Sequence, residues 1–480
     1  MKSAKTLDPL AVDLDGTLIK TDSLIEMFIV SLLRLPWLTF KALLTLFNGK
    51  AAFKKSILDI NLLDIRSFPI RADLLNFLHK QKEKGRKLFL VTAADQKIAD
   101  EIANKLDIFE TASGSSNGHN LKGKHKLKYL QEKFPNGFSY AGDSSADILI
   151  WEKANSLILV GASKSTQRAA ESMDTKIEQI FPAQKANLKT WIKALRIHQW
   201  SKNALLFVPL ALAHKYTDAS AIINVFFTFL YMGLIASGTY LINDLSDLNA
   251  DRKHKTKKNR AIASGAIGAG TALIVALAII SIGLIGAISI SISLLLVMLT
   301  YLTLTLSYSF YFKKIAMLDV VTLGSLYSLR IIMGTIVISA VLSPWLLIFS
   351  LFFFLSLSLA KRYVEIIGTD ENEDKNKLIN GRGYMASDSP MVLAFGVATS
   401  TVAVLILTLY VSNDAFPVDA YNNPQWLWFM TPIILLWIMR IWLLSHRGQM
   451  HDDPVSFAIK DKVSWGLGAL VGLTFIAAIL

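Results

Sequence analysis

The chain has 480 residues, of which 52% are hydrophobic, and a formal net charge of +13. This hydrophobic content is too high for an ordinary soluble protein, and the length favours two or more domains. The absence of cysteine excludes disulfides and thiolate metal sites. The basic balance favours anionic partners such as lipid headgroups or phosphorylated substrates. We expect no nucleic acid partner, because much of the positive charge lies in loops that flank apolar segments.

Three short apolar segments near the N-terminus each lead into polar residues. The first, LAVDLDGTL, contains Asp13 and Asp15, the second, KLFLVTAAD, contains Thr92, and the third, FSYAGDSSAD, contains Asp143 and Asp147. Polar side chains that follow the strands of an α/β sheet face the edge where such proteins bind ligands. The pattern therefore predicts a soluble α/β domain over residues 1–185 with a carboxylate-rich site.

The order of these motifs resembles that of the haloacid dehalogenase-like (HAD) phosphatases, over about residues 8–180. The resemblance implies a Rossmann-like α/β fold with a helical cap, in which Asp13 forms an aspartyl phosphate. Asp15 would protonate the leaving group and then activate water, while Thr92 and Lys126 hold the phosphoryl oxygens. Lys124 is an open alternative to Lys126. The resemblance also implies a Mg²⁺ site made by Asp13, the Asp15 carbonyl and Asp143, with support from Asp147. The competing interpretation is a phosphatase that has become a scaffold.

The insertion at about residues 22–70 is expected to form the cap, and it is unusually apolar. Arg34, Pro36 and Lys41 interrupt it before it reaches the length of a membrane span. Its apolar side chains either pack a cap core or lie on the membrane interface and receive a lipid-linked substrate. The side chains that distinguish these hypotheses are Phe28, Trp37 and Phe40.

Apolar segments of membrane-spanning length follow one another from about residue 203. At about 20 residues per helix, they predict an all-α, multi-pass membrane domain of about nine transmembrane helices over residues 186–480. The predicted spans are 203–214, 219–242, 267–288, 291–312, 318–341, 345–363, 390–412, 425–445 and 463–480. The polar stretch at about 163–190 is expected to be the tether between the two domains.

The loops between these spans differ in charge. One set, which includes residues 251–260, Lys313 and Lys314, and 360–384, is rich in Lys and Arg, whereas the alternate set has very few. The positive-inside rule places the basic set and the N-terminal domain on the cytoplasmic side. We therefore expect a multi-pass protein of the inner (cytoplasmic) membrane.

Residues 243–265 join an acidic pattern to a basic run. Asp244, Asp247 and Asp251 are spaced i, i+3, i+7, which places them on one face of a helix. Three like charges repel unless a cation joins them, and Mg²⁺ binds a few carboxylates together with water and substrate phosphate. We expect a Mg²⁺–diphosphate site here, with Asp244 and Asp247 as metal ligands and Asp251 assisting. The alternative is a solvated loop between membrane helices.

The pattern that begins at Asn243 resembles the first signature of the UbiA-type intramembrane prenyltransferases, and the resemblance covers about residues 190–480. Members commonly transfer a prenyl chain from its diphosphate, and they carry a second acidic cluster on a later cytoplasmic loop. The matching loop here offers only Asp319, with Leu323 where a second acid would stand. This departure argues against ordinary aromatic prenylation.

Five segments in order resemble the decaprenyl-phosphate phosphoribosyltransferase branch: 195–203, 243–265, 360–366, 382–384 and 439–462. That branch implies transfer of phosphoribose from phosphoribosyl pyrophosphate to a polyprenyl (decaprenyl) phosphate, with release of diphosphate. One metal–diphosphate site then suffices, because the lipid is a monophosphate. The resemblance implies that phosphates are contacted by Lys202, Lys257 and Arg260, and that the sugar or the metal shell is contacted by Asn203 and Asn243. It implies that the lipid phosphate is bound by candidates among Lys313, Arg330, Lys361 and Arg362. Asp319 completes the substrate site. Lys313 and Lys314 can instead be interfacial anchors.

Together the two resemblances predict a bifunctional, Mg²⁺-dependent membrane enzyme. The transferase would make a lipid-linked ribose 5-phosphate, and the HAD domain would remove the 5-phosphate. The alternative is a prenyl-diphosphate-dependent aromatic or quinone prenyltransferase with a scaffold HAD domain. The sequence leaves a homo-oligomer open.

Overall fold

The computed structural model describes residues 7–116, 120–184, 186–368, 378, 382–415, 421–450 and 454–480. The chain forms two compact units, one made of Met1–Leu195 with Tyr240–Ala276 and the other of Arg196–Thr239 with Leu277–Leu480. The acidic and basic segment 243–265 thus belongs to the same unit as the N-terminal domain. The predicted boundary near residue 185 does not anticipate this, because a contact between distant segments leaves no local pattern.

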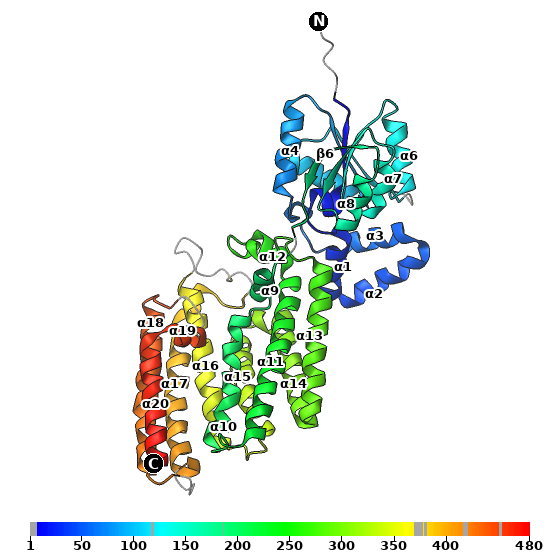
Figure 1. Ribbon diagram of the computed structural model, residues 1–480. Coiled ribbons are helices and arrows are strands. Elements are labelled where there is room, and N and C mark those ends of the chain that lie inside the picture. The colour runs from blue at the N-terminus through cyan, green and yellow to red at the C-terminus, as the bar shows by residue number, and fades with distance from the viewer. Residues whose placement is uncertain are drawn as a thin grey trace. The chain divides into compact units, whose positions relative to one another are not determined.

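A six-stranded parallel sheet forms the centre of the first unit (Figure 1). Its strands are β1 (Leu10–Val12), β2 (Leu88–Asp95), β3 (Thr111–Ser115), β4 (Ser139–Gly142), β5 (Ser156–Val160) and β6 (Lys176–Phe181). They are arranged in the order β3-β2-β1-β4-β5-β6. Because the strand order reverses between β1 and β4, the carboxyl ends of these neighbouring strands open a crevice of the kind that binds ligands.

Helices cover the sheet and build a cap at one end of it. The cap consists of α1 (Ser23–Arg34), α2 (Pro36–Leu44) and α3 (Lys50–Asp59), and an antiparallel bridge between Ile19 and Ile70 closes its base. The other helices of the unit are α4 (Ala72–Glu83), α5 (Gln96–Leu106), α6 (Lys124–Lys133), α7 (Ile148–Trp151), α8 (Lys164–Glu171), α9 (Leu188–Ala194) and α12 (Leu248–Lys253). The predicted helical cap is therefore confirmed.

The predicted tether at residues 163–190 is wrong. This segment contains α8 and β6, the strand at one edge of the sheet. Only Phe181 of β6 is buried. An edge strand with so little buried surface lacks the apolar pattern by which a strand is predicted.

The second unit is helical (Figure 1). The helices are α10 (Val208–Leu212), α11 (Ala219–Ser246), α13 (Ala269–Ile290), α14 (Ile292–Phe310), α15 (Leu318–Val337), α16 (Pro344–Ile367), α17 (Ser389–Tyr410), α18 (Met430–His446), α19 (Pro454–Lys460) and α20 (Lys462–Ile479). α11 begins in this unit and ends in the first, and α13 begins in the first unit and ends in this one. Among the described residues, eight helices are long and apolar enough to cross a membrane. The protein is an integral membrane protein, and the predicted order of an α/β domain with a cap followed by an all-α membrane domain is confirmed.

The first of the nine predicted spans, 203–214, is wrong. Those residues lie in a 3₁₀ segment, Ile197–Phe207, and in the five-residue helix α10. Pro209 stands in the first turn of α10, where its missing N–H fits the start of a helix and prevents one continuous span. α15 is the most buried of the candidate spans, and it carries Asp319 and Arg330 on its buried surface.

Candidate active sites

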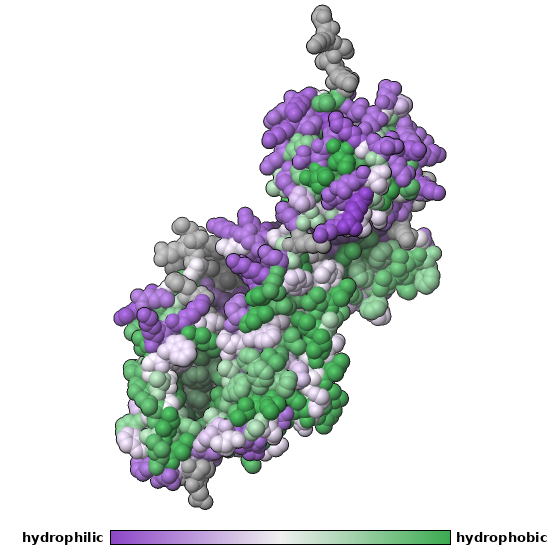
Figure 2. Space-filling view, in the orientation of Figure 1, coloured by the Kyte–Doolittle hydropathy of each residue, from purple (hydrophilic) through white to green (hydrophobic). Residues whose placement is uncertain are grey.

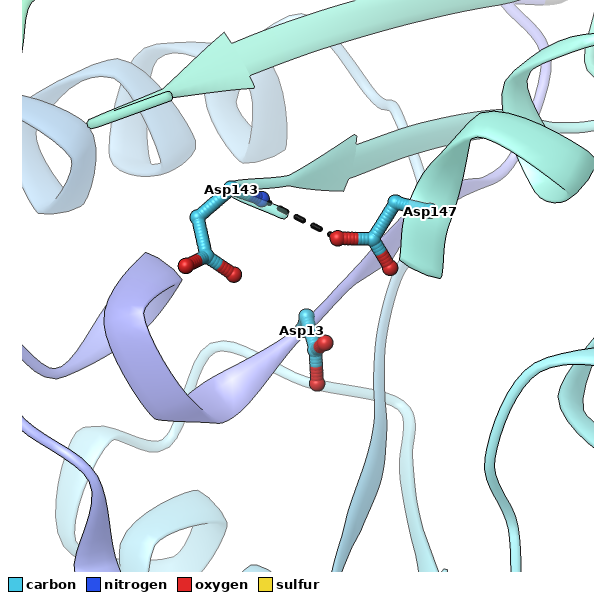
Figure 3. Close-up of side chains that lie close together, drawn as sticks. All are labelled: Asp13, Asp143 and Asp147. Atoms are coloured by element: carbon cyan, nitrogen blue, oxygen red, sulfur yellow. Dashed lines mark hydrogen bonds between the residues drawn. The ribbon is translucent and has the colours of Figure 1, made fainter. Parts of the chain in front are cut away.

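Three carboxylates converge at the carboxyl ends of β1 and β4. Asp13 directly follows β1, Asp143 follows β4, and Asp147 lies one turn further along the chain (Figure 3). One oxygen from each of the three lies within 4.8 Å of the others. The Asp147 carboxylate is fixed because it accepts hydrogen bonds from the backbone N–H groups of Asp143 (3.2 Å) and Ser144 (3.0 Å).

Lys126 supplies the positive charge next to this cluster. Its Nζ lies 2.8 Å from Oδ2 of Asp13 and donates to the Tyr140 hydroxyl at 2.8 Å. That hydroxyl in turn donates to Asp147 at 3.1 Å. Lys124 is exposed at the start of the same helix. The structure thus brings Lys126 to Asp13 and leaves Lys124 in solvent.

Asp15 and Thr92 flank the cluster. The Asp15 carboxylate accepts a hydrogen bond from the Ser23 N–H at 2.7 Å, and burial, with repulsion from Asp22, raises the pKa of Asp15 to about 7. A carboxyl group with this pKa can both give and take a proton near neutral pH. Thr92 is fully buried, and its Oγ1 accepts from the Ala94 N–H at 3.0 Å.

The three-carboxylate cluster fits a hard divalent cation. Burial, with repulsion from Asp13 and Asp147, raises the pKa of Asp143 to about 8. A cation with oxygen ligands would relieve this repulsion, and Mg²⁺ is commonly bound by one or two carboxylates together with a substrate phosphate. Gly16 is required at the site, since its φ is +72° and a Cβ there would lie 2.3 Å from Oδ2 of Asp143.

Two basic residues of this site were not predicted from the sequence. Lys54 of the cap helix α3 donates to the Ala93 carbonyl (2.7 Å) and to Oδ1 of Asn120 (2.9 Å), and burial lowers its pKa. Arg71 donates to the carbonyls of Gly16 (3.1 Å) and Thr17 (3.2 Å) and so holds the loop after β1. Neither residue lies in a recognisable motif, so only the folded chain reveals them.

The acidic segment at the end of α11 forms a second charged cluster. Asp244 lies in the last turn of α11, Asp247 stands between α11 and α12, and Asp251 lies in α12. The helix is interrupted at Asp247, whose backbone angles are φ −91° and ψ 9°. Nη1 of Arg260 bridges the other two acids, at 3.1 Å from Asp244 and 2.7 Å from Asp251. Burial raises the pKa of Asp251.

Asp247 is paired with the cap. Nη2 of Arg34, the last residue of α1, lies 2.9 Å from Oδ1 of Asp247, and its Nε donates to the Ser246 carbonyl at 2.9 Å. The structure thus places an arginine against each of the three acids. Within the described part of the chain, the acids at 244, 247 and 251 are not a group whose ligand atoms all lie within 4.8 Å. The Mg²⁺ ligands at Asp244 and Asp247 remain a prediction.

Some of the basic residues at 252–260 contact the cap, and others are exposed to solvent. Arg252 lies 2.8 Å from Glu26 of α1, and both side chains are almost fully buried. Lys253 lies 3.0 Å from Asp64, while Lys257 is exposed. Two of the basic residues predicted to contact phosphate thus differ in their surroundings. Arg260 is paired with Asp244 and Asp251, whereas Lys257 is exposed to solvent. Asn243 is half-buried.

In the second unit, Arg330 organises a buried polar cluster. Its Nε donates to Oδ1 of Asn203 at 3.0 Å, and its guanidinium lies over the rings of Tyr301 and Tyr327. Nζ of Lys202 lies 5.9 Å from the centre of the Tyr327 ring. The structure thus brings Lys202, Asn203 and Arg330 together around Tyr327, although Arg330 lies more than a hundred residues after the other two.

Asp319 is held by a buried partner. Oδ2 of Asp319 lies 2.6 Å from Nη2 of Arg362, and the Tyr384 hydroxyl donates to Oδ1 of Asp319 at 2.6 Å. Both charged side chains are nearly inaccessible, and Arg362 also pairs with Glu365. Ionisable groups inside a membrane domain are costly unless paired, so this pair fixes α15 against α16. Lys313 and Lys361 are half-buried.

The chain is similar to several known proteins. The model of the UbiA prenyltransferase family matches residues 204–460. The uncharacterized protein y4nM of Sinorhizobium fredii is 42% identical over 98% of this chain and 91% of its own length. Decaprenyl-phosphate phosphoribosyltransferase of Mycobacterium tuberculosis is 30% identical over 63% of this chain and 97% of its own length. For the N-terminal part, a predicted phosphoglycolate phosphatase from Haemophilus somnus is similar in structure, with a TM-score of 0.27 and 17% identity over 37% of this chain and 96% of its own.

Proposed function

Because the chain belongs to the UbiA prenyltransferase family and carries a HAD phosphatase-like domain, we propose that it is a bifunctional enzyme of lipid-linked pentose synthesis. Its membrane domain transfers phosphoribose from phosphoribosyl pyrophosphate to a polyprenyl phosphate, and diphosphate is released. Its HAD domain then removes the 5-phosphate of the lipid-linked product. Both steps use Mg²⁺.

The burial of Asp319 and its pairing with an arginine are the observation on which the proposed reaction of the membrane domain rests. A prenyl-diphosphate enzyme of this family needs acids at a second cluster, and the one acid at that position is buried and neutralised by Arg362. This favours a substrate pair with a single diphosphate. The similarity to a decaprenyl-phosphate phosphoribosyltransferase over 97% of that enzyme's length supports the same choice.

In the transfer step, the bond between the anomeric carbon of the ribose and the diphosphate oxygen breaks, and an oxygen of the lipid phosphate bonds to that carbon. Mg²⁺, when bound, would neutralise the diphosphate as it leaves. Asp244 and Asp247 would hold the cation, with Asp251 assisting. Release of Arg260 from two of these acids would let its guanidinium contact phosphate. Arg330, with Lys202 and Asn203, is the candidate for the sugar and lipid phosphates.

In the hydrolytic step, Oδ2 of Asp13 attacks the phosphorus of the 5-phosphate, and the ribose oxygen leaves with the proton of Asp15. Asp15 then takes a proton from a water molecule, whose oxygen attacks the phosphorus of the aspartyl phosphate. The bond between phosphorus and the Asp13 oxygen breaks, which regenerates Asp13 and releases inorganic phosphate. The pKa of Asp15, about 7, suits both directions of proton transfer. Lys126 lies 2.8 Å from Asp13, where it would neutralise a phosphoryl oxygen.

A shared chain and a shared membrane face explain the fusion. On this proposal the HAD domain and the acidic segment lie on the cytoplasmic side of the inner (cytoplasmic) membrane, an orientation that the positive-inside rule favours for the basic loops. A phosphatase tethered beside the transferase meets its substrate at a high effective concentration.

A comparison of two labelled substrates tests the transferase assignment. The full-length protein in lipid nanodiscs would receive polyprenyl phosphate, Mg²⁺ and labelled phosphoribosyl pyrophosphate, and in a parallel reaction a labelled prenyl diphosphate with an aromatic acceptor. We expect label in the lipid fraction only from phosphoribosyl pyrophosphate. Prenylated aromatic product would instead support the alternative, a prenyltransferase with a scaffold HAD domain.

A further inference from the structure

The cap helix α2 has its apolar side chains on the outside. Its buried residues are Thr39 and Ala42, which are small. Most of its large apolar residues are exposed, with 72% of Trp37 and 58% of Phe40 accessible, and Leu43 is half-buried. A helix that packs only against its own domain buries its large apolar side chains, so α2 has the opposite arrangement.

The end of α2 and the turn after it extend the same surface. Leu44 and Leu46 are exposed, and Phe47 is 91% accessible. We define Trp37, Phe40, Leu44, Leu46 and Phe47 as the cap face. Hydrophobic side chains gather over the cap helices in Figure 2. Contiguous exposed apolar surface of this kind marks an interaction site.

The residue types of the cap face match a lipid interface better than a protein interface. Aromatic side chains with a lysine beside them are characteristic of the headgroup region, where the ring is buried and the ammonium reaches water. Lys41 fits this pattern, since its Nζ lies 6.0 Å from the centre of the Trp37 ring. The chain's excess of 13 positive charges also favours an anionic membrane surface.

The contacts of α1 place α2 near the end of a membrane helix. Arg34 donates to the carbonyl of Ser246, the last residue of α11, which is long and apolar enough to cross a membrane. α2 begins at Pro36, two residues after Arg34. All of these contacting residues belong to the first compact unit. The cap face therefore begins three residues after an arginine that contacts the last residue of α11, within the first compact unit.

We infer that the cap face inserts into the cytoplasmic headgroup layer of the bilayer and holds the phosphatase site next to lipid-linked substrates. The occupant of this face is the lipid itself. This inference deepens the proposed function and, for the choice of substrate, rests on it. A polyprenyl-linked sugar phosphate remains anchored in the bilayer, so a cap that lies on the lipid brings Asp13 to the substrate rather than requiring the lipid to leave the membrane.

Fluorescent labelling tests the docking without reference to activity. The chain contains no cysteine, so Phe47→Cys and Trp37→Cys each carry one environment-sensitive label in the full-length protein in nanodiscs of phosphatidylcholine and phosphatidylglycerol. Glu132→Cys, on the exposed surface of α6, is the matched control. We expect quenching by nitroxide-labelled lipids and protection from iodide at positions 37 and 47, and the reverse at 132.

Two outcomes would overturn the docking. Quenching of the cap labels by iodide and not by nitroxide lipid means that the face lies in water. Protection from both quenchers means that protein covers it, and a crosslink between labelled chains would then identify a second copy.

A kinetic comparison tests the choice of substrate. The double variant Trp37→Glu/Phe47→Glu should lower kcat/KM for lipid-linked ribose 5-phosphate at least tenfold and leave hydrolysis of soluble p-nitrophenyl phosphate unchanged. Equal effects on both substrates, or on neither, would contradict a role of the face in capturing lipid. If the parent protein hydrolyses only the soluble ester, the proposed function fails, while the quenching result still decides the docking.

Discussion

Arg252 and Glu26 form an ion pair, with 2.8 Å between Nη2 and Oε1, although neither side chain is more than 3% exposed. Glu26 lies in the cap helix α1, and Arg252 lies in α12, directly after the acidic segment that resembles a transferase motif. Burial raises the pKa of Glu26, and the facing arginine opposes this shift. The cap of the α/β domain and the segment that follows α11 are therefore joined through charges that are both withdrawn from water.

Removal of one partner of this pair should destabilise the protein strongly. Arg252→Ala leaves Glu26 buried without its counter-charge, which typically costs about 3–5 kcal/mol. The double variant Glu26→Gln/Arg252→Met should recover much of this loss, because no buried charge remains. Thermal unfolding and hydrogen exchange of α1 measure the effect. Equal stability of the single and double variants would show that the pair itself is not what joins the two segments.

Arg34 should compete with a cation for Asp247. The pair is partly exposed, at 32% and 20% of the two side chains, so its contribution is about 0.2–1 kcal/mol. In Arg34→Ala we expect the Mg²⁺ concentration for half-maximal phosphoribosyl transfer to fall about 1.4- to fivefold. Arg66→Ala, an exposed arginine of the same cap, is the control. A Mg²⁺ requirement that is unchanged or higher in Arg34→Ala would argue against Asp247 as a ligand.

Gly16 offers a way to separate the two activities. An alanine Cβ at this position would lie 2.3 Å from Asp143, in a backbone conformation with φ of +72°. Gly16→Ala should reduce phosphatase activity at least a hundredfold and leave transfer intact. Gly85→Ala has a similar φ of +81° and no atom within 4 Å of the added Cβ. The control should keep both activities, and a similar loss in both variants would point to general backbone strain.

Asp143 should make the stability of the Mg²⁺-free protein depend on pH. Burial, with repulsion from Asp13 and Asp147, raises its pKa from 3.8 to about 8. Between these pH values the unfolded chain has released this proton and the folded chain retains it, so stability falls as pH rises from about 4 to about 8. Asp143→Asn removes this dependence. Without Mg²⁺ the unfolding temperature of Asp143→Asn should match that of the parent near pH 4 and exceed it at pH 8. Mg²⁺ should raise the unfolding temperature of the parent only. A difference independent of pH would contradict this account.

The sequence predicted those parts of the fold that leave a local pattern. Asp13 and Asp143 follow strands, so their convergence could be predicted from the rule that parallel strands share a carboxyl edge. The long apolar segments predicted eight of the membrane helices, whereas residues 203–214 were apolar without being helical over a spanning length.

Contacts between distant segments could not be predicted in this way. Arg34 appeared in the sequence only as an interruption of an apolar segment, but in the structure it lies against Asp247, more than two hundred residues away. The acids at 244, 247 and 251 were expected on one helical face, yet the helix is interrupted at Asp247. Helical spacing does not reveal such a break, nor does it reveal which arginine neutralises which acid.

The most direct measurement uses the Asp13→Asn variant of the full-length protein in nanodiscs. With labelled phosphoribosyl pyrophosphate, decaprenyl phosphate and Mg²⁺, the account predicts lipid-linked ribose from the parent and lipid-linked ribose 5-phosphate from Asp13→Asn. The variant Asp244→Asn/Asp247→Asn should give neither. Absence of labelled lipid from both the parent and Asp13→Asn would contradict the account.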